Sequence, residues 1–127
     1  MFGCERCFQT SAREASELRR NFIEVSRLID ESHFIVRVLL CPHCNQRCVS
    51  VFTELIDWSE GDDAQYWSLL PVTLAESEQL IAQGESVDIR LIEALGRERR
   101  YLQVDHPTRK PQRVQWAAGN LLIGPHD

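Results

Sequence analysis

Two Cys-x-x-Cys pairs are the residues of this 127-residue chain whose types and spacing point most directly to chemistry. Cys4 and Cys7 lie near the start of the chain, and Cys41 and Cys44 follow an apolar run. Each pair can form a tight turn, or knuckle, that directs two thiolates at one metal ion, and Pro42 suits such a turn. Two knuckles supply the four sulfurs of a tetrahedral zinc site. We therefore expect Cys4, Cys7, Cys41 and Cys44 to bind one Zn²⁺.

A site closed by four sulfurs has no open position for water or substrate, so it stabilises a fold rather than catalysing a reaction. The sequence contains no glycine-rich phosphate loop and no His-Glu-x-x-His motif. No signature of a catalytic cysteine surrounds any of the five cysteines. We expect that the protein is not an enzyme.

Two alternatives concern the metal site. The gap between the pairs is 33 residues, whereas simple ribbons use about 15–20, so four unrelated reduced thiols remain an alternative. Iron also fits four cysteines, but nothing in the chain marks an electron carrier, and zinc is favoured. Cys48 is expected to be a small residue at the start of a strand, although a role as a replacement ligand or free thiol stays open.

The composition predicts one small domain, spanning residues 1–127, with a modest core. No apolar run approaches the roughly 20 residues that cross a bilayer, and the first residues lack the apolar region of a signal peptide. Paired reduced cysteines without an export signal indicate the cytoplasm, with no membrane partner.

Three helices are predicted. The pattern Ser11-x-x-Glu14 is a capping box, and apolar residues then recur at spacings of three and four, which predicts a helix over 12–31. A second capping box, Thr73-x-x-Glu76, opens a helix that ends at Gly84. A third helix is expected from Val87 to Leu95.

Two hairpins are predicted as well. Residues 34–40 and 49–56 are rich in β-branched residues and flank the second knuckle, which takes the place of an ordinary turn. Residues 100–104 and 113–117 form the second hairpin, and 121–123 a short last strand. The expected class is α+β: a zinc-ribbon-like β-hairpin with an inserted N-terminal helix, two further helices and a C-terminal β-hairpin.

The pair of knuckles, with the second at the tip of a hairpin, resembles the zinc-ribbon class. The resemblance covers residues 4–7 and 34–56. Zinc ribbons occur in transcription factors, RNA polymerase subunits, ribosomal proteins and protein-binding adaptors. The resemblance therefore implies a zinc-stabilised binding role without choosing the partner.

The net charge of −5 is distributed unevenly, with −7 on residues 59–98 and +3 on residues 99–127. The acidic loop, residues 57–63, does not match the ligand pattern of a calcium-binding EF-hand. Acidic surfaces with aromatic anchors favour a basic protein partner, as for an adaptor or an immunity-type inhibitor of a basic toxin. The expected partner-binding residues are Trp58, Glu60, Asp62, Asp63, Tyr66 and Trp67. Ordinary core packing is the alternative for these aromatic residues.

The alternative function is a zinc-ribbon nucleic-acid regulator. It would use the cationic side chains of the C-terminal hairpin, which can lie along phosphates. These are Arg99, Arg100, Arg109, Lys110 and Arg113. The acidic middle of the chain would repel phosphate, and a protein partner is therefore favoured.

Overall fold

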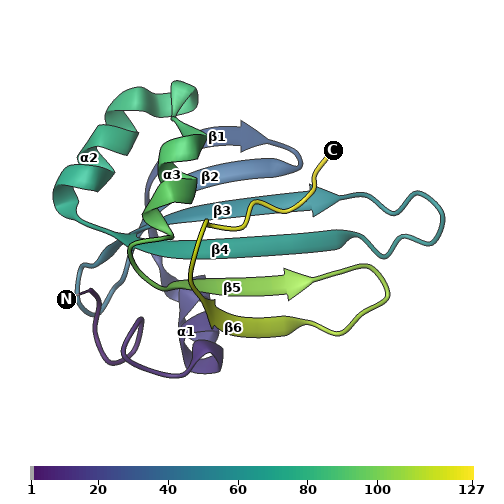
Figure 1. Cartoon of the computed structure of the whole chain (residues 1–127), viewed down its shortest axis with the longest axis horizontal. Helices are drawn as coiled ribbons and strands as arrows, with labels where there is room; N and C mark the ends of the chain where they lie inside the picture. Colours follow the sequence, from purple (N-terminus) through teal and green to yellow (C-terminus); the bar gives the residue numbers. More distant parts are fainter. Residues whose placement is uncertain (1) are drawn as a thin grey trace.

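A six-stranded antiparallel sheet dominates the computed structural model, which describes residues 2–127 (Figure 1). The strands lie side by side in chain order, so each one pairs with its neighbours in the sequence. They are β1 (Ile23–Glu31), β2 (Phe34–Leu40), β3 (Arg47–Leu55), β4 (Ala64–Val72), β5 (Tyr101–His106) and β6 (Arg113–Ala117). The α+β class is confirmed, and the two predicted hairpins, β2–β3 and β5–β6, belong to this one sheet.

The strand β4, which joins the two predicted hairpins, was not predicted. Pro71 lies within it, and a proline argues against a strand inside a sheet because it lacks an N–H donor. In the structure the pairing between β4 and β5 ends at Leu69 and Leu102. Pro71 therefore lies beyond the start of β5, on an edge of β4 that no strand pairs with, while its other edge is opposite Cys48 of β3.

The prediction of one helix over residues 12–31 is wrong. The helix α1 (Ala12–Leu18) ends after two turns, a 3-10 turn η1 (Arg19–Asn21) follows, and β1 begins at Ile23. Two β-bulges interrupt the pairing of β1 with β2. Each bulge shifts the alternation of side chains by one residue, so the apolar residues of β1 recur at spacings that resemble a helix.

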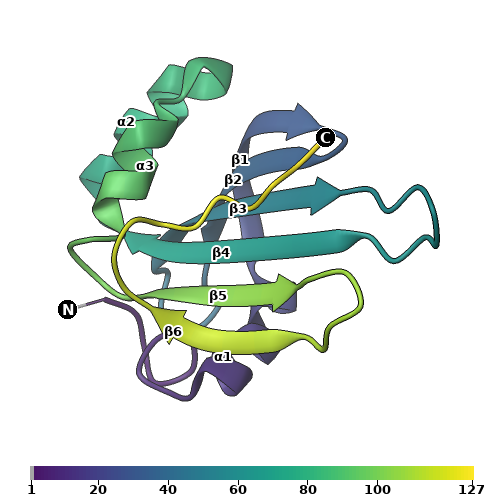
Figure 2. The same ribbon diagram turned by 45° about the vertical axis from the view of Figure 1, so that its right-hand side comes forward.

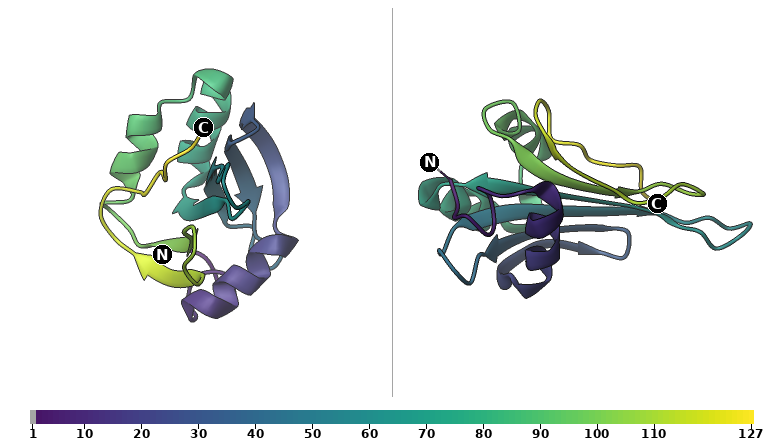
Figure 3. Two further views of the ribbon diagram at one scale, coloured as in Figure 1. Left: turned by 90° about the vertical axis from the view of Figure 1, so that its right-hand side faces the viewer. Right: turned by 90° about the horizontal axis from the view of Figure 1, so that it is seen from below.

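The other helix predictions are confirmed. Thr73 and Glu76 form a reciprocal capping box at the start of α2 (Leu74–Gln83), which ends at Gly84. A 3-10 turn η2 (Gly84–Ser86) leads to α3 (Ile89–Leu95). The helices α2 and α3 lie on one side of the sheet and α1 on the other (Figures 2 and 3).

Each side of the sheet has its own core. On the first side, buried residues of the strands pack against Leu80 of α2 and Ile92 of α3. The predicted strand at 121–123 is wrong, since this segment has no regular structure, but Leu121 is buried in the same core. On the second side, a smaller cluster packs around Ala15 of α1. The C-terminal segment therefore covers the sheet without joining it.

Candidate metal centre

The second knuckle replaces the turn between β2 and β3. The backbone N–H of Cys41 donates to the carbonyl of Gln46 at 2.9 Å, and that of Asn45 donates to the carbonyl of Cys41 at 3.0 Å. Asn45 has a φ of 62°, in the left-handed region that asparagine tolerates better than most residues. The N–H of His43 points at the Cys41 sulfur at 3.5 Å. His43 thus contributes its backbone N–H group to the knuckle.

The first knuckle precedes α1. The N–H groups of Phe8 and Gln9 both donate to the Cys4 carbonyl, at 3.0 and 2.8 Å. Gly3 has a φ of 68°, and a Cβ atom added there would overlap Phe8 and lie 2.9 Å from the Cys7 sulfur. Only glycine satisfies both requirements, so Gly3 lets the chain pass close behind the sulfur.

The four predicted ligands come together. The sulfur atoms of Cys4, Cys7, Cys41 and Cys44 all lie within 4.8 Å of one another. The Cys7 sulfur is 3.7 Å from that of Cys4 and 3.7 Å from that of Cys44. Tetrahedral zinc with Zn–S bonds of about 2.3 Å requires sulfur atoms about 3.8 Å apart. The donor set and its dimensions therefore fit a Zn²⁺ ion.

The thiols differ in their tendency to ionise. Burial opposes the ionisation of Cys4, but hydrogen bonds from the backbone of Arg6 and Cys7 outweigh it and lower its pKa to about 7. Burial is the main cause that raises the pKa values of Cys7 and Cys44 above the ordinary thiol range. A metal must therefore displace protons from these thiols, which makes metal binding weaker at low pH.

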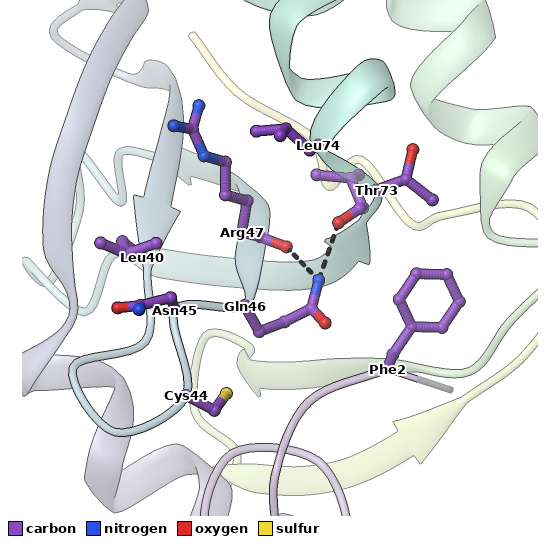
Figure 4. A pocket seen from close by; sticks show the side chains of 9 residues that line it. Phe2, Leu40, Cys44, Asn45, Gln46, Arg47, Thr73 and Leu74 are labelled. Carbon is purple, nitrogen blue, oxygen red and sulfur yellow. Dashed lines mark hydrogen bonds between the residues drawn. The ribbon is translucent and has the colours of Figure 1, made fainter.

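Gln46 connects the two knuckles, and the sequence offered no signal for this role. Its side-chain oxygen accepts from the N–H of Gly3 at 2.8 Å. Its amide nitrogen donates to the carbonyls of Arg47 and Val72, at 2.8 and 2.7 Å (Figure 4). One side chain thus joins the first knuckle to the end of the β3–β4 pair.

A cavity of about 630 Å³ opens beside the second knuckle, against the first turn of α2 (Figure 4). Phe2, Leu40 and Leu74 form its apolar walls, and Arg47 and Cys44 also line it. Cys44 is half-buried whereas Cys7 and Cys41 are buried. One edge of the metal centre is therefore open to solvent.

Arg99 and Arg100, which the nucleic-acid alternative would place on phosphates, hold the N-terminal segment. The Arg99 guanidinium lies 4.6 Å from the centre of the Phe2 ring and pairs with Glu76 at 2.6 Å. The Arg100 guanidinium lies between two rings, 4.6 Å from that of Phe8 and 4.3 Å from that of Trp116. Both arginines, which directly precede β5, therefore hold the segment that carries Cys4 and Cys7.

Two of the three remaining cations of the predicted basic hairpin form ion pairs. Arg113 pairs at 3.0 Å with Asp105, whose side chain is buried. Arg109 pairs with the acidic loop, at 2.9 Å from Glu60 and 3.6 Å from Asp57. Lys110 has no ion-pair partner among the described residues. Four of the five side chains are thus occupied within the protein.

The acidic loop is ordered by its own carboxylates. The N–H of Asp57 donates to Asp63 at 2.9 Å. In turn the Asp57 carboxylate accepts from the N–H groups of Ser59, Glu60 and Asp62. Hydrogen bonds from the Ser59 hydroxyl, and then from these N–H groups, lower the pKa of Asp57. These carboxylates therefore cap backbone N–H groups of the loop.

A second set of contacts, the loop clasp, ties the acidic loop to the β5–β6 turn. Arg109 contributes the two ion pairs described above, and its N–H donates to the Asp62 carboxylate at 2.6 Å. The hydroxyl of Thr108 donates to the Asp62 carbonyl at 2.8 Å. The acidic loop and the turn of the basic hairpin, which the sequence analysis assigned to alternative functions, therefore contact each other.

The three aromatic residues of the predicted partner surface lie in different parts of the structure. Trp58 is 86% exposed in the acidic loop. The Trp67 ring lies against that of Phe52, with ring centres 5.0 Å apart and ring planes tilted by 43°, on the side of the sheet that carries α1. Tyr66 is on the opposite side, where Gly124 of the C-terminal segment packs against its ring. The structure leaves Trp58 as the exposed aromatic residue of the acidic loop.

Cys48 lies outside the group of four. It occupies β3, is 5% exposed and packs in the core around α1. Burial raises the pKa of its thiol. Its position agrees with the expectation of a small residue at the start of a strand.

Comparison with protein-family models, with curated proteins and with solved structures found no match to this chain. None of the helices in residues 2–127 has the length and apolar character that crossing a bilayer requires.

Proposed function

We propose that the protein is a non-catalytic protein-binding module whose fold is stabilised by one Zn²⁺ held by Cys4, Cys7, Cys41 and Cys44. The metal cross-links the N-terminal segment to the β2–β3 hairpin. Four sulfurs complete the tetrahedral coordination, so the ion has no free position for a substrate. The gathering of the four sulfur atoms within 4.8 Å is the observation that supports the metal.

The exposure of Trp58 on an ordered loop supports the binding role. An indole that is 86% exposed leaves a large apolar surface in water, and tryptophan is enriched among residues that dominate binding energy. The loop clasp and the hydrogen bonds to Asp57 fix the backbone on which the indole stands. An ordered loop loses less conformational entropy on binding, and this increases affinity.

The charge around Trp58 favours a basic partner. The side chain of Glu60 is 63% exposed, and the loop carries three further carboxylates beside the single guanidinium of Arg109. Such a surface increases the rate at which a basic protein associates, and salt reduces this effect. An adaptor or an inhibitor of a basic protein has these properties.

The test is a binding comparison of two variants. Proteins captured by the zinc-loaded chain are purified and titrated against wild type, Trp58→Ser and the control Leu74→Ser. Leu74 is also exposed, at 58%, but lies on α2 at the other end of the sheet. We expect Trp58→Ser to weaken binding by at least about thirtyfold, the loss of a hot-spot residue, and Leu74→Ser to bind as wild type. Equal binding by all three proteins would contradict the proposal.

A further inference from the structure

The side of the sheet that carries α1 is only partly covered. The helix packs where Ala15 meets Leu102 and Val104 of β5. Towards β2 and β3 the same side of the sheet carries Phe52 and Ile35, both half-buried. We call this region the open face. It is distinct from the acidic loop and from the metal centre.

Aromatic and apolar side chains form the middle of the open face. Trp67 and Phe52 are directly opposite each other on β4 and β3, and Ile35 of β2 is opposite Phe52. A shallow cavity of about 300 Å³ lies over these three residues and is also lined by Arg27 and Arg37. An apolar floor, in which the Phe52 and Trp67 rings are tilted by 43° to each other, is thus bordered by guanidinium groups.

Arginines continue from this floor onto the end of α1. The Arg19 guanidinium lies 4.9 Å from the centre of the Trp67 ring. Burial, followed by the positive charges of Arg20 and Arg37, lowers the pKa of Arg19. A second cavity, of about 250 Å³, follows on the far side of Arg19 and is lined by Arg13 and Arg20. The contact between Arg19 and Trp67 therefore links the two cavities, because Trp67 lines the first and Arg19 the second. We call the two cavities and the cations between them the track.

Few carboxylates neutralise this track. Glu24 is 3.5 Å from Arg37 and 2.8 Å from Arg27, which also pairs with Asp30. Glu17 lines the second cavity. Arg13, Arg19 and Arg20 form no ion pair among the described residues. The open face therefore has an excess of positive charge in a protein whose net charge is −5.

We propose that the open face binds single-stranded nucleic acid, with a base stacked on Phe52 beside Trp67 and phosphates on Arg19, Arg20 and Arg37. Single strands combine planar apolar bases with a negative charge on every nucleotide, and proteins bind them through aromatic side chains beside cationic grooves. A duplex hides its bases, and a broad sheet does not enter its major groove. An acidic peptide would satisfy the arginines but leave the aromatic floor without a planar partner.

The experiment uses the zinc-loaded protein and a fluorescein-labelled oligothymidylate at low salt, with binding followed by fluorescence anisotropy. The variants are Arg37→Gln, Phe52→Leu and the control Arg90→Gln, which removes the same charge from α3 on the opposite side of the sheet. Zinc content and thermal unfolding verify that each variant is folded. A polyglutamate peptide serves as the competing ligand.

We expect wild type and Arg90→Gln to bind equally. Phe52→Leu should bind at least about fivefold more weakly, as for the loss of one base-stacking contact. Arg37→Gln should reduce the slope of log affinity against log salt by about 0.7, the value for one phosphate contact on a single strand. Trp58→Ser should bind as wild type, which separates this surface from the acidic loop.

Three results would overturn the inference. These are no binding at low salt, equal weakening by Arg37→Gln and Arg90→Gln, or displacement of the oligonucleotide by polyglutamate at equal charge concentration. The last result would assign the open face to an acidic peptide.

Discussion

The two ends of the sheet are held together by different interactions. At one end, four cysteine sulfurs from two distant segments lie within 4.8 Å, supported by Gln46 and by the Arg99 and Arg100 guanidinium groups. At the other end, the acidic loop and the β5–β6 turn are joined by the loop clasp, whose main cation, Arg109, is 56% exposed. The first end is built from four candidate metal ligands and largely buried contacts, the second from exposed charges.

This difference predicts which end controls stability. Metal ligation contributes directly to folding, whereas exposed ion pairs contribute about 0–1 kcal/mol each. The end of the sheet with the four cysteines should therefore determine whether the protein folds. The loop end should determine how Trp58 is presented, with little influence on stability.

The largest effect is expected from removing a ligand. Cys44→Ser should lose the metal and lower the free energy of unfolding by more than about 4 kcal/mol, since loss of a structural metal is among the most destabilising changes. Thermal unfolding with and without a chelator measures this effect. The chelator should lower the unfolding temperature of the wild type and leave that of Cys44→Ser unaltered.

Cys48→Ala is the matched control, because Cys48 is buried in β3 outside the group of four. Its metal content should equal that of wild type. Loss of zinc from this variant would show that the fifth sulfur is a ligand.

A smaller effect is expected from Gly3→Ala. Gly3 and Gly61 both have positive φ, of 68° and 75°, but only Gly3 has neighbours that a Cβ atom would overlap. Gly61→Ala should cost about 1 kcal/mol of backbone strain, and Gly3→Ala about 2 kcal/mol more from overpacking against Phe8 and Cys7. Chemical unfolding measures the free energy of unfolding of both variants. The difference between them reports how closely the backbone at Gly3 approaches Phe8 and Cys7. Equal losses would indicate that the first knuckle adapts freely.

The pairing of Glu76 with Arg99 should contribute in a pH-dependent manner. Partial burial raises the pKa of Glu76, but hydrogen bonds from Arg99 and from the N–H of Thr73 outweigh it and hold the pKa below its ordinary value. A lowered folded-state pKa stabilises above the unfolded pKa of about 4.3 and loses its effect as the pH falls through the folded value.

Glu76→Gln should therefore be less stable than wild type at neutral pH, and this difference should shrink below about pH 4. Glu78→Gln, on the exposed side of the same helix, is the control and should match wild type. Unfolding free energies across this pH range measure both variants. A difference for Glu76→Gln that stays constant with pH would contradict the role of the ion pair.

The smallest effect on stability is expected from Arg109→Gln, at most about 1 kcal/mol because the ion pairs are exposed. Hydrogen exchange of the acidic loop should nevertheless increase, because the loop clasp is lost. High salt should produce the same increase in wild type. Lys110→Gln, next in the chain and without an ion-pair partner, should leave hydrogen exchange unchanged. A stable loop in Arg109→Gln would show that the Asp57 hydrogen bonds alone suffice.

Much of the fold could be predicted where the signals were local. The capping box at Thr73, the end of α2 at Gly84 and the strands on either side of the second knuckle all depend on neighbouring residues. The strand β1 could not be predicted, because its bulges replace the alternation of a strand with helix-like spacing. The strand β4 was obscured by Pro71, whose tolerance depends on where β5 begins.

The same distinction applies to the sites. The grouping of the four cysteines could be predicted, because each Cys-x-x-Cys pair places two sulfur atoms close together within four residues. The roles of Arg99 and Arg100 were not evident, since their partners Phe2 and Phe8 are more than ninety residues away in the chain. The run of positive charge in the sequence therefore suggested a basic surface, whereas in the fold these two arginines contact other residues of the protein.

X-ray absorption at the zinc edge of the purified protein tests the central claim most directly. The account predicts one zinc per chain, coordinated by four sulfur atoms at about 2.3 Å. A protein without zinc, or a zinc ion with nitrogen or oxygen in its first coordination sphere, would contradict it.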